Sequence, residues 1–420
     1  MKVFRYFIIL FISNLLVISV IGSCVADEIN IADPKTTTME WRDDTANLDL
    51  VKKLNEAYSH FPFSREYDGV LDQCPFRIEW LVGPNMPMVW KGGAAGIISN
   101  EVIMAGGLWT ARFNRTLSYN LITGEYMELP PLPLSPEYTQ GACDGTALYV
   151  VSGRMFGRHV YKLAKDKKNT WQWEALPLLP DTMGKGRWLS TVSIIPGKWL
   201  FLIEGRQTPV LDERVERQLP SYRLRLDRPN ASWEPMALFP GGRRVLPQSV
   251  AVRGKVYFFG GNTDADSTSY RLMGELVTDH KIARLQNNII YNSREAWRYD
   301  PETDRWERIR NLPFAMHAGQ SIALENRYIL IMGSSYILTE RVGKTMQSDK
   351  PICTFYGDRI LCYDIEKDIY SHVGAMLYGM STCPWVTDGK YVYGFGGEPA
   401  HGYNYNTDNV LQIGELIKQY

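Results

Sequence analysis

The chain has 420 residues, of which 45% are hydrophobic and 22% are charged, and these values are typical of globular proteins. Its 46 basic and 46 acidic residues give a formal net charge of zero, which argues against nucleic-acid binding because that function needs a basic surplus. The 35 glycines, 23 prolines and 12% aromatic residues favour many short strands joined by turns.

Residues 1–26 have the pattern of an export signal. Two basic residues precede a mostly apolar run over residues 7–21, and small residues follow as far as Ala26. Two processing routes remain open. Cleavage after Ala26 would release a periplasmic or secreted protein. Lipidation of Cys24 would anchor it to a membrane, because the preceding residues resemble a bacterial lipoprotein signal.

Residues 27–75 are expected to form an N-terminal extension. Leu50, Leu54 and Phe61 follow a helical spacing, which predicts a short helix packed against the main domain. Cys353 and Cys362 lie near each other in the sequence. Two alternatives remain open for them, a disulfide in an oxidising compartment or buried free thiols.

A unit of four predicted strands repeats from Lys91 to Gln412. Its clearest copy spans residues 244–313 and begins with two apolar strands that end at Gly260-Gly261. A long insertion follows, then a strand ending in Tyr-Asp, and then a Trp strand that runs into Leu-Pro. Six copies of one strand order predict six similar sheets.

The last unit lacks its Trp strand, whereas residues 76–81 form a Trp strand with no unit before it. Blades arranged around an axis cover their edges only if the ring closes. The sequence therefore predicts an all-β fold over residues 76–420, a six-bladed β-propeller whose last blade is closed by an N-terminal strand.

The order Gly-Gly, Tyr-Asp, Trp and Leu-Pro resembles Kelch repeats over roughly residues 76–416. Two features more closely resemble the sialic acid mutarotases, the N-acetylneuraminate epimerase family. The first is the insertion over residues 262–294, and the second is Gly396-Gly-Glu398 in the last blade. The resemblance implies an exported six-bladed Kelch protein that acts on an acidic sugar and uses no cofactor.

The resemblance also implies a glutamate after the second strand of the blade that follows the insertion, and an arginine six residues later. In this sequence those positions are Ser334 and Glu340, and Arg341 lies next to the second of them. The sequence departs from the family pattern here.

Two sets of loops converge at one face of such a propeller. The loops after the second strands carry Trp109, Arg154, Arg206, Tyr336 and Glu398, and those before the innermost strands carry Lys91, Arg187, Arg244 and His317. Six basic residues would thus face Glu398 and form a basic funnel that concentrates anions. Arginines bind carboxylates in bidentate fashion, and Trp109, Trp188 and Tyr336 would offer flat surfaces to sugar rings.

Three functions remain open. A mutarotase would use Glu398 as a base, with Arg206 or Arg341 holding the sugar carboxylate. A lyase acting on uronic-acid polymers would use an arginine to neutralise the carboxylate, while His317 and a tyrosine exchange protons. A non-catalytic module would bind carbohydrate or protein.

The histidines show no metal-ligand spacing, so no metal is expected. A helix is expected over residues 279–286, where it would form a lid or the contact of a homodimer.

Overall fold

The computed structural model describes residues 73–107, 114–154, 156–180, 187–207, 218–262, 293–313, 315–340, 350–377, 379–399 and 408–419. All of them belong to the larger of two compact units, residues 42–420, and the other unit comprises residues 1–41. The expected signal peptide, the lipid anchor at Cys24, the helix beginning at Leu50 and the helix over 279–286 lie outside the described residues.

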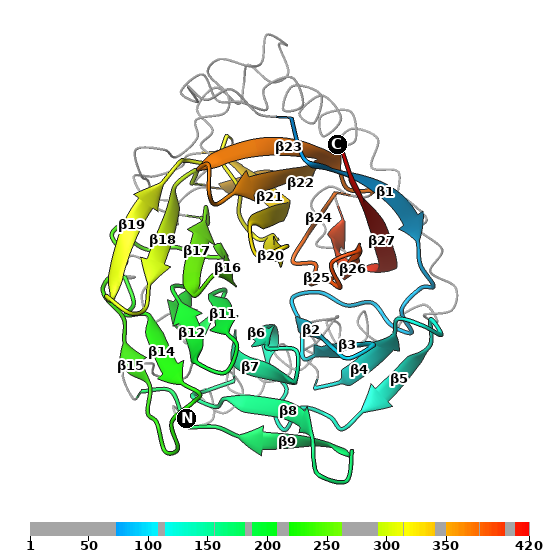
Figure 1. The fold of residues 1–420 in the computed structure, drawn as a ribbon, viewed down its shortest axis with the longest axis vertical. Helices are drawn as coiled ribbons and strands as arrows, with labels where there is room; N and C mark the ends of the chain where they lie inside the picture. Colours follow the sequence, from blue (N-terminus) through cyan, green and yellow to red (C-terminus); the bar gives the residue numbers. More distant parts are fainter. Residues whose placement is uncertain are drawn as a thin grey trace, which may run out of the picture. The chain divides into compact units, whose positions relative to one another are not determined.

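The described strands form six antiparallel blades in a ring, which confirms the predicted six-bladed β-propeller (Figure 1). Blade 1 consists of β2 (Ala94–Ile98), β3 (Glu101–Ala105), β4 (Thr116–Asn120) and β5 (Tyr126–Leu129). Blade 2 consists of β6 (Glu137–Cys143), β7 (Ala147–Arg154), β8 (Tyr161–Lys165) and β9 (Trp171–Ala175). Blade 3 consists of β11 (Thr191–Ile195), β12 (Trp199–Ile203), β14 (Tyr222–Arg225) and β15 (Glu234–Pro235), beside the short pair β10 (Arg187–Trp188) and β13 (Arg206–Gln207).

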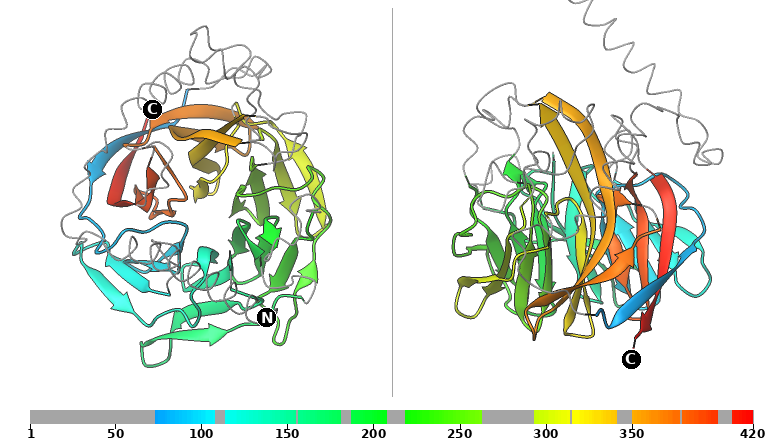
Figure 2. Two further views of the ribbon diagram at one scale, coloured as in Figure 1. Left: turned by 180° about the vertical axis from the view of Figure 1, so that it is seen from behind. Right: turned by 90° about the horizontal axis from the view of Figure 1, so that it is seen from above.

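Blade 4 consists of β16 (Gln248–Val252), β17 (Lys255–Phe259), β18 (Ala296–Asp300) and β19 (Arg305–Ile309). Blade 5 consists of β20 (Gln320–Leu324), β21 (Tyr328–Glu340), β22 (Lys350–Asp364) and β23 (Ile369–Ala375). Blade 6 consists of β24 (Met380–Ser381), β25 (Trp385–Thr387), β26 (Tyr391–Pro399), β27 (Asp408–Lys418) and β1 (Phe76–Val82). β21 and β22 are the longest of these strands, and in side view they rise beyond the other blades (Figure 2).

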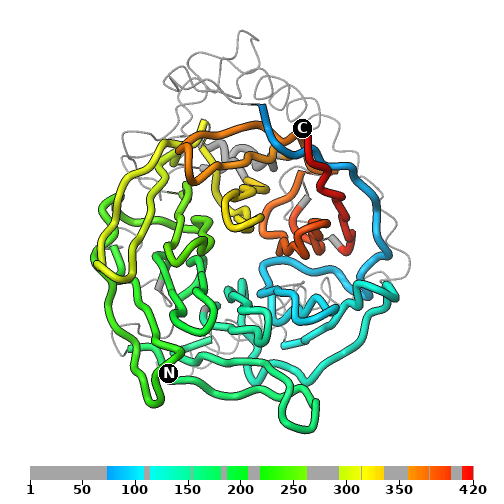
Figure 3. Tube along the Cα trace, viewed as in Figure 1, coloured from blue at the N-terminus to red at the C-terminus, as the bar shows by residue number. Residues whose placement is uncertain are grey.

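The ring closes through the N-terminal strand. The chain visits the blades in order and returns to the last one, where β1 lies beside β27 (Figure 3). The two strands pair antiparallel from Phe76 with Lys418 to Val82 with Gln412. The predicted closure of the last blade is therefore confirmed.

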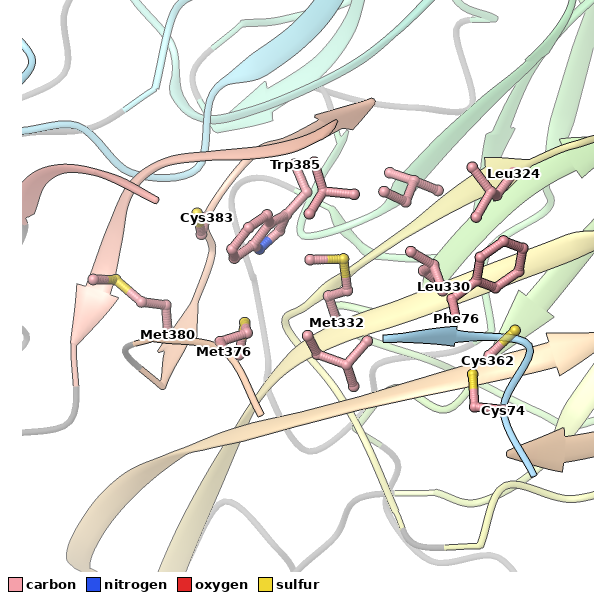
Figure 4. Close-up of a cluster of buried hydrophobic side chains, with 13 residues drawn as sticks. Cys74, Phe76, Leu324, Leu330, Met332, Cys362, Met376, Met380, Cys383 and Trp385 are labelled. Atoms are coloured by element: carbon pink, nitrogen blue, oxygen red, sulfur yellow. The ribbon is translucent and has the colours of Figure 1, made fainter. Parts of the chain in front are cut away.

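Position within a blade explains the residue types. The second strand of each blade lies between two neighbouring blades, so both of its faces are covered and its sequence is apolar throughout, as in the fully buried β12. The outermost strands are more exposed, as the pattern of β19 shows. Each core cluster is formed by buried side chains from two adjacent blades. Figure 4 shows one of these clusters, in which Phe76 and Trp385 of blade 6 pack with Leu330 of blade 5.

The recurring Trp and Leu-Pro segments have a physical role at the rim of the ring. An aromatic side chain in or beside each outermost strand donates a hydrogen bond to a backbone carbonyl that follows the outermost strand of the preceding blade. The six bonds run from Trp80 to Ala375 (2.7 Å), Tyr126 to Pro84 (3.1 Å), Trp173 to Pro130 (2.8 Å), Trp233 to Pro177 (2.9 Å), Trp306 to Ala237 (3.0 Å) and Tyr370 to Arg310 (2.7 Å). The rim is therefore held together by one such bond for each pair of adjacent blades.

A second repeated contact lies near the centre of the ring. One residue before or at the start of each innermost strand adopts a left-handed backbone, and these residues are Gly92, Tyr138, Leu189, Leu246, Ala318 and Thr382. Backbone hydrogen bonds of 2.7–2.9 Å join five of them in turn, from Gly92 to Thr382, Ala318, Leu246 and Leu189. These four bonds fix the starts of the innermost strands of blades 1, 6, 5, 4 and 3 relative to one another.

The structure bears on the two alternatives for the cysteines. Cys353 and Cys362 lie on the same strand, β22, nine residues apart. An extended strand places their Cα atoms about 30 Å apart, far beyond the roughly 7 Å that a disulfide can bridge. Cys362 is a free and buried thiol, and Cys143 is also free.

Candidate functional site

The strand ends that carry the described residues of the expected site share one face of the ring. In each blade the innermost strand pairs antiparallel with the second strand, so the first begins where the second ends. Ala94 pairs with Ala105 in blade 1, and Gln248 pairs with Phe259 in blade 4. The face that carries these strand ends is called the loop face below.

Blade 3 departs from four other blades at the position that follows the first five residues of the second strand. In blades 1, 4, 5 and 6 this position is a glycine with positive φ, namely Gly106 (64°), Gly260 (59°), Gly333 (70°) and Gly396 (58°). In blade 3 the residue is Glu204, with a φ of 54°. A left-handed backbone costs a residue with a Cβ about 1–2 kcal/mol, and such strain gathers at functional sites. Glu204 is therefore a functional candidate that the sequence analysis missed.

The Glu204 carboxyl group is fully buried. Its Oε1 accepts a hydrogen bond from Gln218 Nε2 at 3.2 Å, and its Oε2 accepts one from the backbone N–H of Arg244 at 3.1 Å. Burial raises the pKa of Glu204 to about 7, although these hydrogen bonds and the charges of Arg187 and Arg244 act in the opposite direction. A carboxyl group with this pKa can accept and release a proton near neutral pH.

Two buried arginines flank this carboxyl group. The guanidinium of Arg187 donates to the backbone carbonyl of Glu204 at 3.3 Å and to that of Pro220 at 2.7 Å, and burial lowers the pKa of Arg187 to about 10. Arg244 is fully buried and forms an ion pair with Glu295 at 2.7 Å. The ion pair with Glu295 thus balances the positive charge of Arg244.

A second buried carboxylate lies in blade 6, three blades away around the ring. Glu398 forms an ion pair with Lys91 of blade 1, and both side chains are at most 5% exposed. Ser381 Oγ donates to Glu398 Oε2 at 3.2 Å, and the Tyr138 hydroxyl of blade 2 donates to Oε1 at 3.4 Å. This polar cluster joins three blades, and Lys91 balances the charge of Glu398.

Two aromatic side chains, Tyr138 of blade 2 and Trp188 beside blade 3, also belong to the loop face. The ring centroids of Tyr138 and Trp188 are 6.1 Å apart, and both residues are partly exposed. The Arg154 guanidinium lies over the Trp188 ring at 5.2 Å and pairs with Glu137 at 3.0 Å. These side chains offer a flat aromatic surface with hydrogen-bond donors beside it, which suits a sugar ring.

The remaining expected site residues are distributed as follows. His317 is buried before the innermost strand of blade 5, and its backbone N–H donates to Ser334 Oγ at 3.2 Å. Arg206 lies on β13 opposite Trp188. Trp109 and Arg341 lie outside the described residues, and Tyr336 belongs to β21 but its side chain is not described.

The prediction of a basic funnel did not take three acidic residues into account. Sequence reading set six basic side chains against Glu398, whereas Glu137, Glu204 and Glu295 also lie at the strand ends on this face. The sequence analysis missed these glutamates because each lies at a strand end, and the sequence does not reveal which residues of the adjacent blade surround that end. Arg243 and Arg294, which the sequence analysis did not consider, are also buried there. The described part of the loop face therefore carries paired charges of both signs.

In the described ranges, no three or more His, Cys, Asp or Glu side chains are grouped so that they could hold a metal ion. Those ranges also contain no helix with the length and apolar character needed to cross a bilayer.

The chain is similar in sequence to curated bacterial proteins. It is 23% identical over 205 residues to an N-acetylneuraminate epimerase of Haemophilus influenzae strain PittEE, a match that covers 47% of this chain and 48% of that protein. It is 23% identical over 176 residues to the enzyme of that name from Yersinia pestis strain Pestoides F, covering 37% and 40% of the two chains. The chain thus spans about half the length, or less, of the curated relatives it matches. No protein-family model matches it, so the resemblance to Kelch repeats stays a prediction.

Proposed function

We propose that this protein is a carbohydrate-active enzyme that interconverts the anomers of an acidic sugar. The observation that carries the proposal is the buried Glu204, whose pKa is raised to about 7 at a position where four other blades have glycine. The similar curated proteins are named N-acetylneuraminate epimerases, so N-acetylneuraminate is the first substrate to test.

The chemistry of mutarotation requires a proton acceptor and a proton donor. The acceptor removes the proton of the anomeric hydroxyl group while the bond between the anomeric carbon and the ring oxygen breaks, and the ring oxygen gains a proton. Closure on the other face of the carbonyl group gives the other anomer and returns both protons. We assign the acceptor role to Glu204, and we assign binding of the sugar carboxylate to Arg206, two residues further along the chain.

This assignment differs from the one expected from the sequence, in which Glu398 is the base. Lys91 already balances the charge of Glu398, and Ser381 and Tyr138 donate hydrogen bonds to its two oxygens. Both carboxylate oxygens of Glu398 are therefore already engaged by donors within the protein. Glu398 and the aromatic pair of Tyr138 and Trp188 are better suited to binding sugar hydroxyl groups and the sugar ring.

The test starts from a single anomer of N-acetylneuraminate and follows its equilibration by proton NMR. The wild-type protein should accelerate equilibration well above the spontaneous rate. Glu204→Gln should lower kcat by about 10²-fold or more, because general-base catalysis contributes about 10²–10⁴-fold. Glu398→Gln is the matched control and should mainly raise KM.

Three outcomes would contradict the proposal. Equal kcat in the wild type and in Glu204→Gln would remove Glu204 as the base. An unsaturated uronate chromophore released from uronic-acid polymers would favour the lyase. Binding of acidic sugars without any acceleration in the wild type would favour a non-catalytic module.

We also propose that the protein is exported, on the basis of the pattern of residues 1–26. Expression of the full-length gene in bacteria, followed by cell fractionation and intact-mass analysis, tests this proposal. A mass that begins after Ala26 indicates cleavage, whereas a diacylated Cys24 indicates a lipoprotein. An unprocessed protein in the cytoplasm would contradict export.

A further inference from the structure

Two cysteines that are 288 positions apart in the sequence meet at the closure of the ring. Cys74 lies two residues before the closing strand β1, and Cys362 lies on β22 of blade 5. Both residues belong to the same buried cluster, and Figure 4 shows the two side chains next to each other beneath Phe76. The Ser371 hydroxyl donates a hydrogen bond to the backbone carbonyl of Cys362 at 3.5 Å.

The surroundings hold this pair in place. The Phe76 ring packs edge-on against the Tyr328 ring, with centroids 5.1 Å apart, and the carbonyl of Pro75 accepts a hydrogen bond from the backbone N–H of Gln419 at 2.8 Å. Cys74 is 6% exposed and Cys362 is 1% exposed, so both sulfur atoms belong to the core between blades 5 and 6. The neighbouring Cys362 side chain lowers the pKa of Cys74 to about 7, which favours the reactive thiolate.

We propose that Cys74 and Cys362 are a redox-active pair and that they form a disulfide which fixes the closing strand β1 to blade 5. The strand β1 is held by its backbone hydrogen bonds to β27 and by the packing of Phe76, which are both non-covalent. A covalent bond at Cys74 would keep β1 in place even when those hydrogen bonds open. It would also join β1 to a blade other than the one whose sheet it completes.

The oxidant is a disulfide, either a small one such as oxidised glutathione or that of a thiol–disulfide oxidoreductase. The Cys74 thiolate attacks one sulfur of the oxidant, forms a mixed disulfide and releases the first thiolate. The Cys362 thiolate then attacks Cys74 Sγ, forms the intramolecular disulfide and releases the second thiolate. Two protein thiols are oxidised, one disulfide is reduced to two thiols, and their two protons pass to the released thiolates.

Burial determines when this exchange can occur. Because both sulfur atoms are nearly inaccessible in the closed ring, an oxidant reaches them before β1 docks or while β1 is transiently detached. The disulfide should therefore form efficiently during oxidative folding and slowly in the folded, reduced protein.

The experiment uses the full-length chain, unfolded under reducing conditions and then refolded either with a glutathione redox buffer or with a reductant. Free thiols are alkylated, and the digested protein is mapped by mass spectrometry. The oxidised protein should yield a peptide pair linked through Cys74 and Cys362. Its Tm should exceed that of the reduced protein by about 5 °C, because the bond closes a loop of nearly 300 residues.

Three variants provide the comparison. Cys74→Ala and Cys362→Ala should each abolish the difference in Tm between oxidised and reduced protein. Cys383→Ala removes a sulfur atom from the same core cluster, where Cys383 contacts the backbone carbonyls of Pro384 and Phe395, and it should retain the difference.

Several results would overturn the proposal. Complete alkylation of both cysteines after oxidative refolding would show that they do not pair, and so would a glutathione adduct or a link from Cys362 to any other cysteine. A linked pair with an unchanged Tm would show that the bond does not secure the closure. Retention of the difference in Cys74→Ala would assign it to another part of the chain.

Discussion

Replacement of Glu204 by glutamine should change how the stability of the protein depends on pH. Burial raises the pKa of this carboxyl group from 4.5 to about 7, so the folded state binds its proton more tightly than the unfolded state does. The contribution of Glu204 to stability therefore falls as the pH rises from about 4.5 to about 7 and stays low above that range. A glutamine at this position does not titrate.

The size of the effect follows from the same shift. One pKa unit corresponds to about 1.4 kcal/mol, so ionising Glu204 in the folded state costs about 3 kcal/mol once the pH exceeds 7. Most of this change falls between pH 5 and pH 8. For a domain of this size it corresponds to a change in Tm of about 3 °C.

The assay is thermal unfolding of the wild type and of Glu204→Gln at several pH values from 5 to 8. Other titrating groups are present in both proteins, so their effects largely cancel in the difference in Tm. That difference should shift by about 3 °C in favour of the variant as the pH rises. Glu398→Gln provides a control for the loss of a buried carboxylate that is paired with Lys91.

Parallel Tm profiles for the wild type and Glu204→Gln would refute the reasoning. They would mean that the folded and unfolded states bind the Glu204 proton equally well, and a group of that kind would not be poised as a base. A shift in the opposite direction, with the variant losing stability as the pH rises, would mean that the flanking arginines outweigh burial.

Three further substitutions test other parts of the structure. Glu204→Gly should raise stability by about 1 kcal/mol or more while abolishing mutarotation, because glycine accepts the left-handed backbone without strain; unfolding and activity assays on one preparation check both effects. Lys91→Met should lower stability by about 3–5 kcal/mol, because it leaves Glu398 buried without its ion-pair partner, and the additional change Glu398→Gln should restore much of the loss in denaturant titrations. Trp306→Phe should cost about 1 kcal/mol in unfolding experiments, because Ala237 O loses its donor at the rim.

The fold could be predicted because its signals are local and repeated. The Trp strand of each unit and the Leu-Pro segment of the preceding one recur in the sequence, and the structure shows a hydrogen bond between them, as from Trp173 to the carbonyl of Pro130. The strand β1 could be assigned to the last blade because the sequence shows both that the last unit lacks a Trp strand and that an unpaired Trp strand precedes the first unit. Neither inference needs knowledge of distant contacts.

The site could be predicted only in outline, because its chemistry arises between blades. The sequence placed Lys91, Arg187, Arg244 and Glu398 on one face but did not show that Lys91 and Glu398 would pair with each other. It did not single out Glu204, although a glutamate at the position of the Gly-Gly marker is the signal that would have revealed it. The meeting of Cys74 with a residue in blade 5 likewise depends on ring closure.

The position of Glu204 also explains how a strained backbone can persist there. The next residue, Gly205, donates its backbone N–H to the carbonyl of Arg244 at 2.9 Å, and Leu246 donates to the carbonyl of Leu189 at 2.7 Å. These bonds between blades 3 and 4 hold the strand end in the conformation that the other blades adopt with glycine. The ring therefore determines the backbone at residue 204 whatever side chain it carries. A buried carboxyl group there raises the energy of the folded state both through its φ and through its ionisation, so we infer that the stability of the fold and the activity proposed here place opposite demands on this one residue.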